Sequence, residues 1–159
     1  MEHEPLDTQV IELIGRNRLG SELLHAGLEI ALPARDRGID LIVYADLSSE
    51  VKTFTACPIQ MKAASSRSFS LFWKYEKFAN LIIAYVWFVD DPDPKKSETY
   101  ALTYPEALQV ATEMGWTKTE SWAKDGYSTT SPSDKLLNIL SKHRMTKEKW
   151  REKVLGQAV

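Results

Sequence analysis

The sequence predicts a single mixed α/β domain, and three observations carry that prediction. The chain has 159 residues, 43% of them apolar and 26% charged, which is enough to bury a core without disulfide or metal staples. Apolar residues at helical spacing alternate along the chain with short branched or aromatic runs. The longest apolar run, residues 81–89, is about half a membrane span and is typical of a strand buried on both faces. A central sheet covered by helices follows from this pattern.

The first predicted element is a helix that begins at Asp7 or Thr8, either of which can cap exposed amides, and that ends at Gly27. Its apolar stripe is predicted to consist of Val10, Leu13, Ile14, Leu23 and Leu24. Strands are expected over residues 28–32, 39–44 and about 52–62, with residues 46–50 as a hairpin connection. Pro58 indicates an edge position or a bulge in the third strand.

The second half of the chain continues the alternation of predicted helices and strands. Residues 65–78 are expected to form a loop, a short strand and a short helix, before strands over 81–89 and 98–103. Pro105 suits the first turn of a helix that runs to Met114 and stops at Gly115. One or two helices, broken near Thr146, are expected over residues 133–155. The domain core therefore spans about residues 8–115, and a helical extension spans about 131–159.

Composition excludes several classes of protein. Twenty basic and twenty-two acidic side chains give a net charge of −2, which argues against a strongly basic nucleic-acid coat or a polybasic membrane binder. The single cysteine, Cys57, excludes an internal disulfide and has the apolar neighbours of a buried, inert thiol. Residues 1–5 are acidic and polar, unlike a secretory signal, so a cytoplasmic location is expected.

Asp40, Gln60 and Lys62 are the residues with the clearest chemistry. Gln60 and Lys62 lie two apart on one strand and so share a face, and a hairpin with the preceding strand would bring Asp40 beside them. A carboxylate binds Mg²⁺ well, and an amide oxygen is a weaker neutral ligand. A lysine beside the metal can orient water and stabilise charge that develops on phosphorus.

Residues 38–43 (GIDLIV) followed by residues 58–64 (PIQMKAA) resemble the bipartite signature of the PD-(D/E)xK nuclease superfamily, the restriction-endonuclease-like and Holliday-junction-resolvase-like proteins. Residues 22–30 resemble the helix-to-strand entry of small bacterial members, and the resemblance covers about residues 8–103. It implies a restriction-endonuclease-like αβββαβ core and a DNA endonuclease that uses Mg²⁺ or Mn²⁺. It also implies catalytic roles for Asp40, Gln60 and Lys62.

Two departures from the family pattern concern the acidic residues. The usual second carboxylate is here Gln60, which some branches share and which lowers the negative charge at the metal site. The family often adds a glutamate from the first helix, for which Glu12 is the candidate and Glu22 the alternative, while Arg16 stands where some relatives have the acid. The resemblance implies four metal ligands: Asp40, Gln60, Glu12 and the backbone carbonyl of Met61.

Nucleic-acid contacts are expected after the third strand. The net charge hides a basic stretch, because residues 51–80 carry five basic side chains and one acidic side chain. The predicted phosphate contacts are Ser65, Arg67, Lys74 and Lys77. The neighbouring aromatic residues suit either base stacking or the core. A second basic stretch, over residues 142–153, is typical of a solvated helix face, with DNA-backbone contact as the alternative.

Three functions remain open on the sequence. The first is a metal-dependent DNA endonuclease. The second, motivated by the missing carboxylate, is a nucleic-acid-binding module on a nuclease fold with little or no catalysis. The third is a structural or interaction protein of a defence or mobile-element system, with the five tryptophans as interface residues. Many members of the superfamily dimerise to treat both strands of DNA, so a homodimer is expected. No membrane partner is expected.

Overall fold

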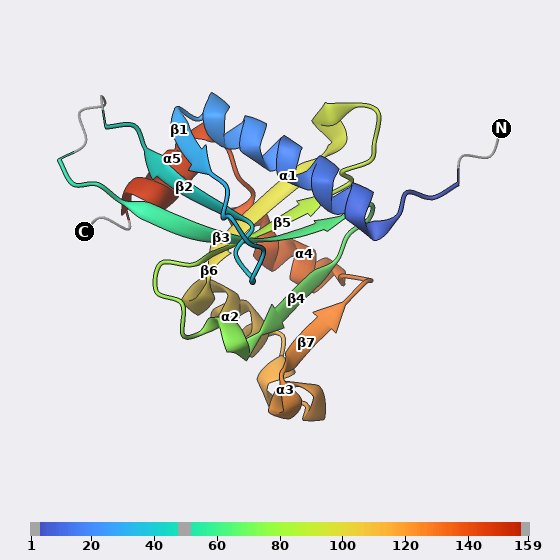
Figure 1. Ribbon diagram of the computed structural model, residues 1–159. Helices are drawn as coiled ribbons and strands as arrows, with labels where there is room; N and C mark the ends of the chain where they lie inside the picture. The colour runs from blue at the N-terminus through green and yellow to red at the C-terminus, as the bar shows by residue number, and fades with distance from the viewer. Residues whose placement is uncertain (1–3, 48–51, 157–159) are drawn as a thin grey trace.

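The computed structural model describes residues 4–47 and 52–156 and is built around a five-stranded mixed sheet (Figure 1). The strand order is β1-β2-β3-β5-β6, with β3 and β5 parallel and the other neighbours antiparallel. These strands are β1 (Leu28–Ala31), β2 (Leu41–Ala45), β3 (Ala56–Ala64), β5 (Ile82–Trp87) and β6 (Glu98–Thr103). Two further strands, β4 (Phe69–Phe72) and β7 (Gly126–Thr129), pair antiparallel in a separate small sheet. The predicted mixed α/β class is confirmed.

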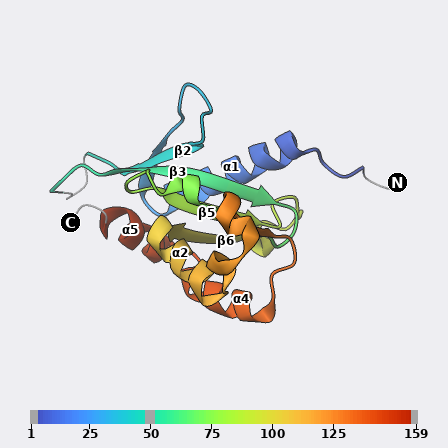
Figure 2. The ribbon, with the colours of Figure 1, turned by 90° about the horizontal axis from the view of Figure 1, so that it is seen from below.

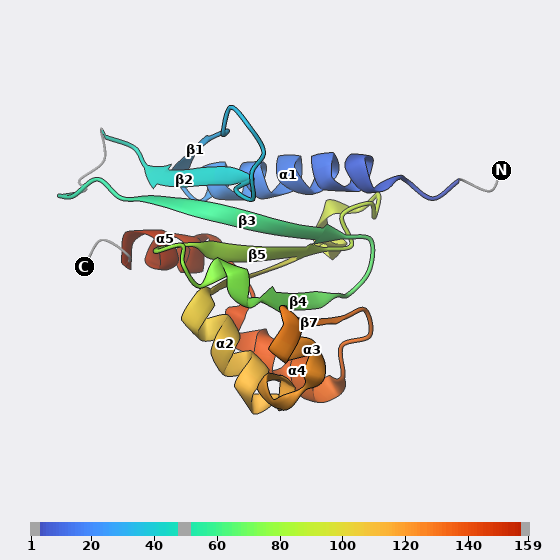
Figure 3. The same ribbon diagram turned by 60° about the horizontal axis from the view of Figure 1, so that its bottom comes forward.

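Helices cover both faces of the main sheet (Figure 3). The helix α1 (Thr8–His25) lies along one face, and α5 (Lys147–Leu155) packs beside it. The other face carries β4 together with α2 (Tyr104–Glu113) and α4 (Asp134–Leu140), while α3 (Glu120–Lys124) lies next to β7. No helix within residues 4–47 and 52–156 is long and apolar enough to cross a membrane.

The sheet separates two hydrophobic clusters. Leu19 and Leu23 of α1 and Trp150 of α5 pack on one face of the sheet. The aromatic residues Tyr85 and Trp87 of β5 pack on the other. Because β5 is an interior strand covered on both faces, all six of its residues are buried, as predicted.

The predicted apolar stripe of α1 is confirmed at Leu23 and in part at Ile14, and it is wrong at its other three positions. Asp7 caps the helix as predicted, by accepting a hydrogen bond from the Val10 N–H at 2.9 Å. The residues that face the sheet, however, are Ile11, Gly15, Leu19, Gly20 and Leu23. Val10, Leu13 and Leu24 are exposed, and Ile14 is half-buried. The physical reason is close approach: a Cβ on Gly15 would lie 2.5 Å from the Cβ of Ala63, so only glycine lets the helix axis come this near to β3.

Strand boundaries differ from the sequence-based expectation in two places. The second strand begins at Leu41, which leaves Asp40 just before it, and the third runs from Ala56 to Ala64 instead of 52–62. Pro58 pairs with β2, but the pairing of β3 with β5 starts only at Ile59. Pro58 is therefore locally at an edge, as expected, where its missing N–H costs no ladder bond. The hairpin connection expected at 46–50 lies partly outside the described residues.

The crossover from β3 to β5 follows the expected order of loop, strand β4 and a short 3-10 turn at Trp73–Tyr75. Over residues 98–155 the predicted strand and helices are present, and Thr146 caps α5 at the expected break. Strand β7 and helix α3, by contrast, carry no clear pattern in the sequence. A partner strand, β4, supplies the pairing that stabilises β7.

Candidate functional site

Asp40 lies at the point where β2 separates from β3. Its backbone N–H donates to the Ile59 carbonyl at 2.9 Å, and its Oδ2 accepts a hydrogen bond from the Met61 N–H at 2.6 Å. Because backbone groups alternate sides along a strand, the Met61 N–H and carbonyl both face β2. The carboxylate thus takes the place of the strand partner that β2 no longer provides.

Gln60 flanks this carboxylate and has one unused oxygen. Its side chain is buried, at 9% exposure, and its Nε2 donates to the Met61 carbonyl at 3.3 Å. Its Oε1 has no hydrogen-bond partner in the part of the chain that the structure describes. Gly38, at φ +95°, lets the chain turn close by, since a Cβ there would lie 4.0 Å from this oxygen. A buried amide oxygen without a donor calls for a ligand, a cation or water.

Lys62 is held by aromatic side chains. Its Nζ donates to the Tyr75 hydroxyl at 3.1 Å and lies 5.5 Å from the Tyr75 ring centre and 5.7 Å from that of Phe72. No carboxylate of the described residues lies within ion-pair distance of Lys62. The ammonium is therefore fixed in position while its charge remains available.

Electrostatics ties these residues into one site. Burial raises the pKa of Asp40, and the nearby Asp36 raises it as well. The hydrogen bond from Met61 and the positive charges of Arg16 and Lys62 lower it, without reversing the shift. The carboxylate is thus partly desolvated, which favours binding of a further cation or donor.

The acids proposed on α1 do not join this site. Glu12 is exposed and makes no hydrogen bond or ion pair with any described residue. Glu22 lies elsewhere, where its two oxygens accept hydrogen bonds from the Thr99 hydroxyl and the Trp150 Nε1, both at 2.7 Å. The residue of α1 whose charge acts on Asp40 is Arg16. Helical spacing alone could not distinguish these side chains, because the glycines set the rotation of the helix.

The donors at the site fit Mg²⁺ or Mn²⁺ in kind, since the Asp40 carboxylate, the Gln60 amide and the Met61 carbonyl are all oxygen ligands. The unpaired Gln60 Oε1 is the feature that most favours a cation. Asp40 supplies the one carboxylate among these three ligands, and the second carboxylate nearby, Asp36, acts on it by charge. Within residues 4–47 and 52–156 no three His, Cys, Asp or Glu side chains are grouped to hold a metal. A metal bound here would be held weakly.

The expected nucleic-acid contacts are exposed but spread along the crossover. Ser65 and Arg67 lie in the loop after β3, and the Arg67 Cζ lies over the Phe88 ring, 5.7 Å from its centre. Lys74 lies over the same Phe72 and Tyr75 rings as Lys62, so the two lysines flank one aromatic pair. Lys77 lies over Phe78, further along the crossover.

Trp73 adds an exposed aromatic surface beside Lys74. It is 43% exposed, and its Nε1 donates to the Trp122 carbonyl at 2.9 Å, which fixes the ring. Phe69, by contrast, is buried in the core. The aromatic residues of the crossover therefore divide between the core, which holds Phe69, and the surface, which holds Trp73.

The connection between β1 and β2 projects from the sheet and leads directly into Asp40 (Figure 2). It carries Arg35 and Arg37, both exposed and without an ion pair to any described residue. Neither arginine is among the phosphate contacts predicted from the sequence. The signal that marks it is two arginines next to the candidate catalytic acid.

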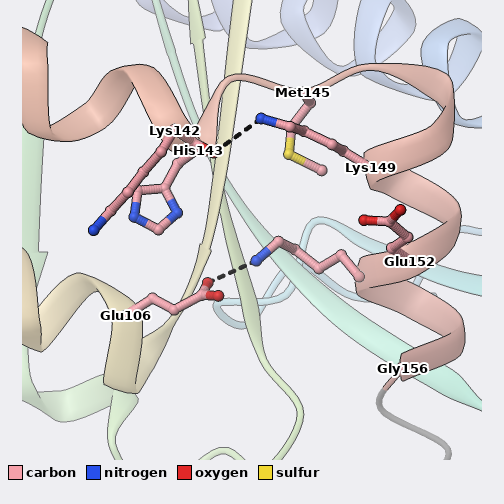
Figure 4. A pocket seen from close by; sticks show the side chains of 8 residues that line it. Glu106, Lys142, His143, Met145, Lys149, Glu152 and Gly156 are labelled. Atoms are coloured by element: carbon pink, nitrogen blue, oxygen red, sulfur yellow. Dashed lines mark hydrogen bonds and ion pairs between the residues drawn. The ribbon is translucent and has the colours of Figure 1, made fainter.

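The basic C-terminal residues form a different pocket (Figure 4). Lys153 Nζ donates to Glu106 at 2.6 Å, and Lys149 Nζ donates to the Lys142 carbonyl at 2.9 Å. Burial and the lysines around it lower the pKa of His143, against the opposing effect of Glu106. The apolar side of α5 is fully buried, as expected for a solvated helix that docks through one face. Two of its lysines thus serve internal contacts.

Comparisons with known proteins add no relatives: no protein-family model, curated protein or solved structure matches this chain.

Proposed function

We propose that this chain is a metal-dependent endonuclease that hydrolyses phosphodiester bonds in DNA. One juxtaposition supports the proposal: Asp40 bonds to the Met61 N–H, between Gln60 and Lys62. This combines a partly desolvated carboxylate, an unpaired amide oxygen and an ammonium without an ion pair at one end of β2. The mixed sheet and the initial order of one helix and three strands agree with the fold that the PD-(D/E)xK resemblance implies, whereas strand β4 and a 3-10 turn stand between β3 and β5 where that fold has a helix.

The residues of the chain have distinct roles in this proposal. Asp40 and the Gln60 Oε1 would hold the metal, with the Met61 carbonyl on the same side of β3. A bound Mg²⁺ or Mn²⁺ would supply Lewis-acid polarisation of the phosphate and would lower the pKa of a bound water. Lys62, positioned by Tyr75, would orient the attacking water and stabilise negative charge on the phosphate oxygens. Arg67, Lys74 and Lys77 would contact the DNA backbone.

A plasmid-nicking assay with Mg²⁺ and with Mn²⁺ tests the assignment. Asp40→Asn keeps an oxygen that can accept from Met61 but removes the charge, and Lys62→Ala removes the ammonium. Each variant should lose cleavage by about 100-fold or more. Lys95→Ala, which removes an exposed lysine from the β5–β6 connection, is the matched control and should cleave like the wild type. Undiminished nicking by both Asp40→Asn and Lys62→Ala would refute the site.

A second function, DNA binding without hydrolysis, is favoured by a specific observation. The charge of Arg16 acts on Asp40 from the helix on which an acid was expected, and Asp40 is the one carboxylate among the three ligands proposed here. In this case the wild type would bind DNA but would nick no plasmid with either metal. Asp40→Asn would then bind at least as tightly as the wild type, because it removes a negative charge from a phosphate-binding surface.

A further inference from the structure

The candidate metal site contains a buried oxygen that no donor in the described part of the chain satisfies. Gln60 is nine-tenths buried, at 9% exposure, and its Oε1 has no hydrogen-bond partner there. Its Nε2 donates to the Met61 carbonyl, while the Asp40 carboxylate accepts from the Met61 N–H, so amide and carboxylate lie along the same edge of one residue. A buried acceptor without a donor indicates a binding site.

The unpaired oxygen faces the turn at Gly38. This turn belongs to the connection between β1 and β2, which projects from the sheet in Figure 2. Gly38 has φ +95°, a conformation that favours glycine, and a Cβ at this position would lie 4.0 Å from the Gln60 Oε1. Because Asp40 follows two residues later, the turn and the Asp40 carboxylate border the same amide.

Asp36 holds a second carboxylate at this turn. Its Oδ1 accepts a hydrogen bond from the Gly38 N–H at 3.4 Å. The side chain is exposed and forms no ion pair with a residue that the structure describes. After burial, the charge of Asp36 is the second influence that raises the pKa of Asp40, and it exceeds the effect of either nearby cation. The two carboxylates are therefore close enough to repel each other.

Two carboxylates and an amide oxygen are a donor set for a divalent cation. A cation between Asp36 and Asp40 replaces their repulsion by attraction, and it also satisfies the Gln60 Oε1. Mg²⁺ is usually held by one or two carboxylates and keeps several waters, which suits a site where one carboxylate is exposed. An anion, by contrast, would meet two like charges.

We propose that Asp36 is the second carboxylate ligand of the divalent cation held by Asp40 and the Gln60 Oε1. The inference rests on the proposed metal site, but it requires no hydrolysis. In the family pattern the second acid stands on the third strand, at the position of Gln60. Here the connection before β2 supplies it instead, across the turn at Gly38.

Metal binding without DNA tests the inference apart from cleavage. The full-length protein is titrated with Mn²⁺ by isothermal titration calorimetry. Asp36→Asn keeps an oxygen that can accept from the Gly38 N–H but removes the charge, so it should bind Mn²⁺ about tenfold more weakly. Asp36→Glu keeps the charge and moves the oxygens by one methylene group. A direct ligand therefore loses affinity in Asp36→Glu, whereas a remote charge loses none.

The matched control is Asp134→Asn, which removes the same charge from an exposed residue in the first turn of α4 and should bind Mn²⁺ like the wild type. Thermal melting in EDTA checks that each variant is folded. Added Mn²⁺ should then raise the melting temperature of the wild type more than that of Asp36→Asn. Wild-type affinity in either Asp36→Asn or Asp36→Glu, or equal losses in Asp36→Asn and Asp134→Asn, would overturn the inference.

The outcomes also separate this inference from the proposed function. A wild type that binds no Mn²⁺ would overturn both. Mn²⁺ binding that depends on Asp36, without nicking of plasmid DNA, would overturn only the endonuclease. Mn²⁺ binding that depends on Asp40 but not on Asp36, together with nicking, would overturn only the role of Asp36.

Discussion

At the scale of single residues, burial separates two acids that look alike in the sequence. Glu12 and Glu22 both lie on α1 and both suit a catalytic acid by position. Glu12 points to solvent, while Glu22 receives hydrogen bonds from β6 and α5. Burial raises the pKa of Glu22, and the hydrogen bonds from Trp150 and Thr99 offset this only in part. Glu22 therefore connects three elements of the fold at an electrostatic cost.

Replacing Glu22 separates the hydrogen bonds from the charge. Glu22→Gln keeps an oxygen that can accept from Trp150 or Thr99 and removes the buried charge, so at pH 7 it should be as stable as the wild type or more stable. Glu22→Ala leaves the Trp150 N–H unpaired and should cost about 2–3 kcal/mol. Urea unfolding measures both.

The pH dependence gives an independent check on Glu22. Because its pKa in the folded state is raised above 4.5, its contribution to stability is most favourable below pH 4.5 and is lost as pH rises through the folded-state pKa. The stability of Glu22→Gln relative to the wild type should therefore increase over that range and then level off. A difference that is constant from pH 4 to pH 8 would contradict this account.

At the scale of elements, the contact between α1 and β3 sets the geometry of the candidate site. The largest apolar side chains of α1 predicted which face of the helix contacts the sheet, but the glycines Gly15 and Gly20 bring a different face to it. A helix can approach a sheet more closely where it has no side chain, and the close packing gained there outweighs the exposure of Leu13, at 55%, and Leu24, at 50%. The same rotation lets the charge of Arg16 act on Asp40.

Gly15→Ala tests this contact. Alanine is a better helix former than glycine by about 1 kcal/mol, yet its Cβ would meet the Cβ of Ala63 at 2.5 Å. Overpacking should dominate, with a net loss of about 1–3 kcal/mol in the free energy of unfolding. Gly20→Ala is the control, because there the nearest atom is the flexible end of Ile30 at 3.1 Å. An equal or higher stability of Gly15→Ala would show that α1 can shift away from β3.

At the scale of the whole molecule, the C-terminal helix α5 connects two other helices of the fold, α1 and α2. Trp150 reaches Glu22 on α1, and Lys153 reaches Glu106 at the start of α2 (Figure 4). The side chain of Lys153 is only 13% exposed. Burial raises the pKa of Glu106, but the hydrogen bonds from Lys153 and the Thr103 N–H outweigh it and leave the pKa lowered. Segments about fifty residues apart thus stabilise each other through one charge pair.

Acid should therefore weaken the attachment of α5. A pKa of Glu106 below 4.5 means that its stabilising contribution is present above pH 4.5 and is lost as pH falls through the folded-state value. Glu106→Gln retains the capping box with Thr103, so it isolates the charge. It should cost about 1–2 kcal/mol at pH 7 and little at pH 3, as measured by urea unfolding at each pH. A loss of equal size at both pH values would assign the effect to helix capping.

The sequence by itself determined the α/β class, most element positions and the caps at Asp7 and Thr146, because these depend on local periodicity and on short-range hydrogen bonds. It also predicted Asp40, Gln60 and Lys62 as one group, because side chains two apart on a strand share a face and a hairpin places the preceding strand beside them. Only the tertiary structure decided that the charge of Arg16, and not that of Glu12 or Glu22, acts on the Asp40 carboxyl. The rotation of α1 about its axis depends on how closely it packs against β3, which is about fifty residues away in the sequence. The hydrophobic periodicity of the helix contains no information about that packing distance.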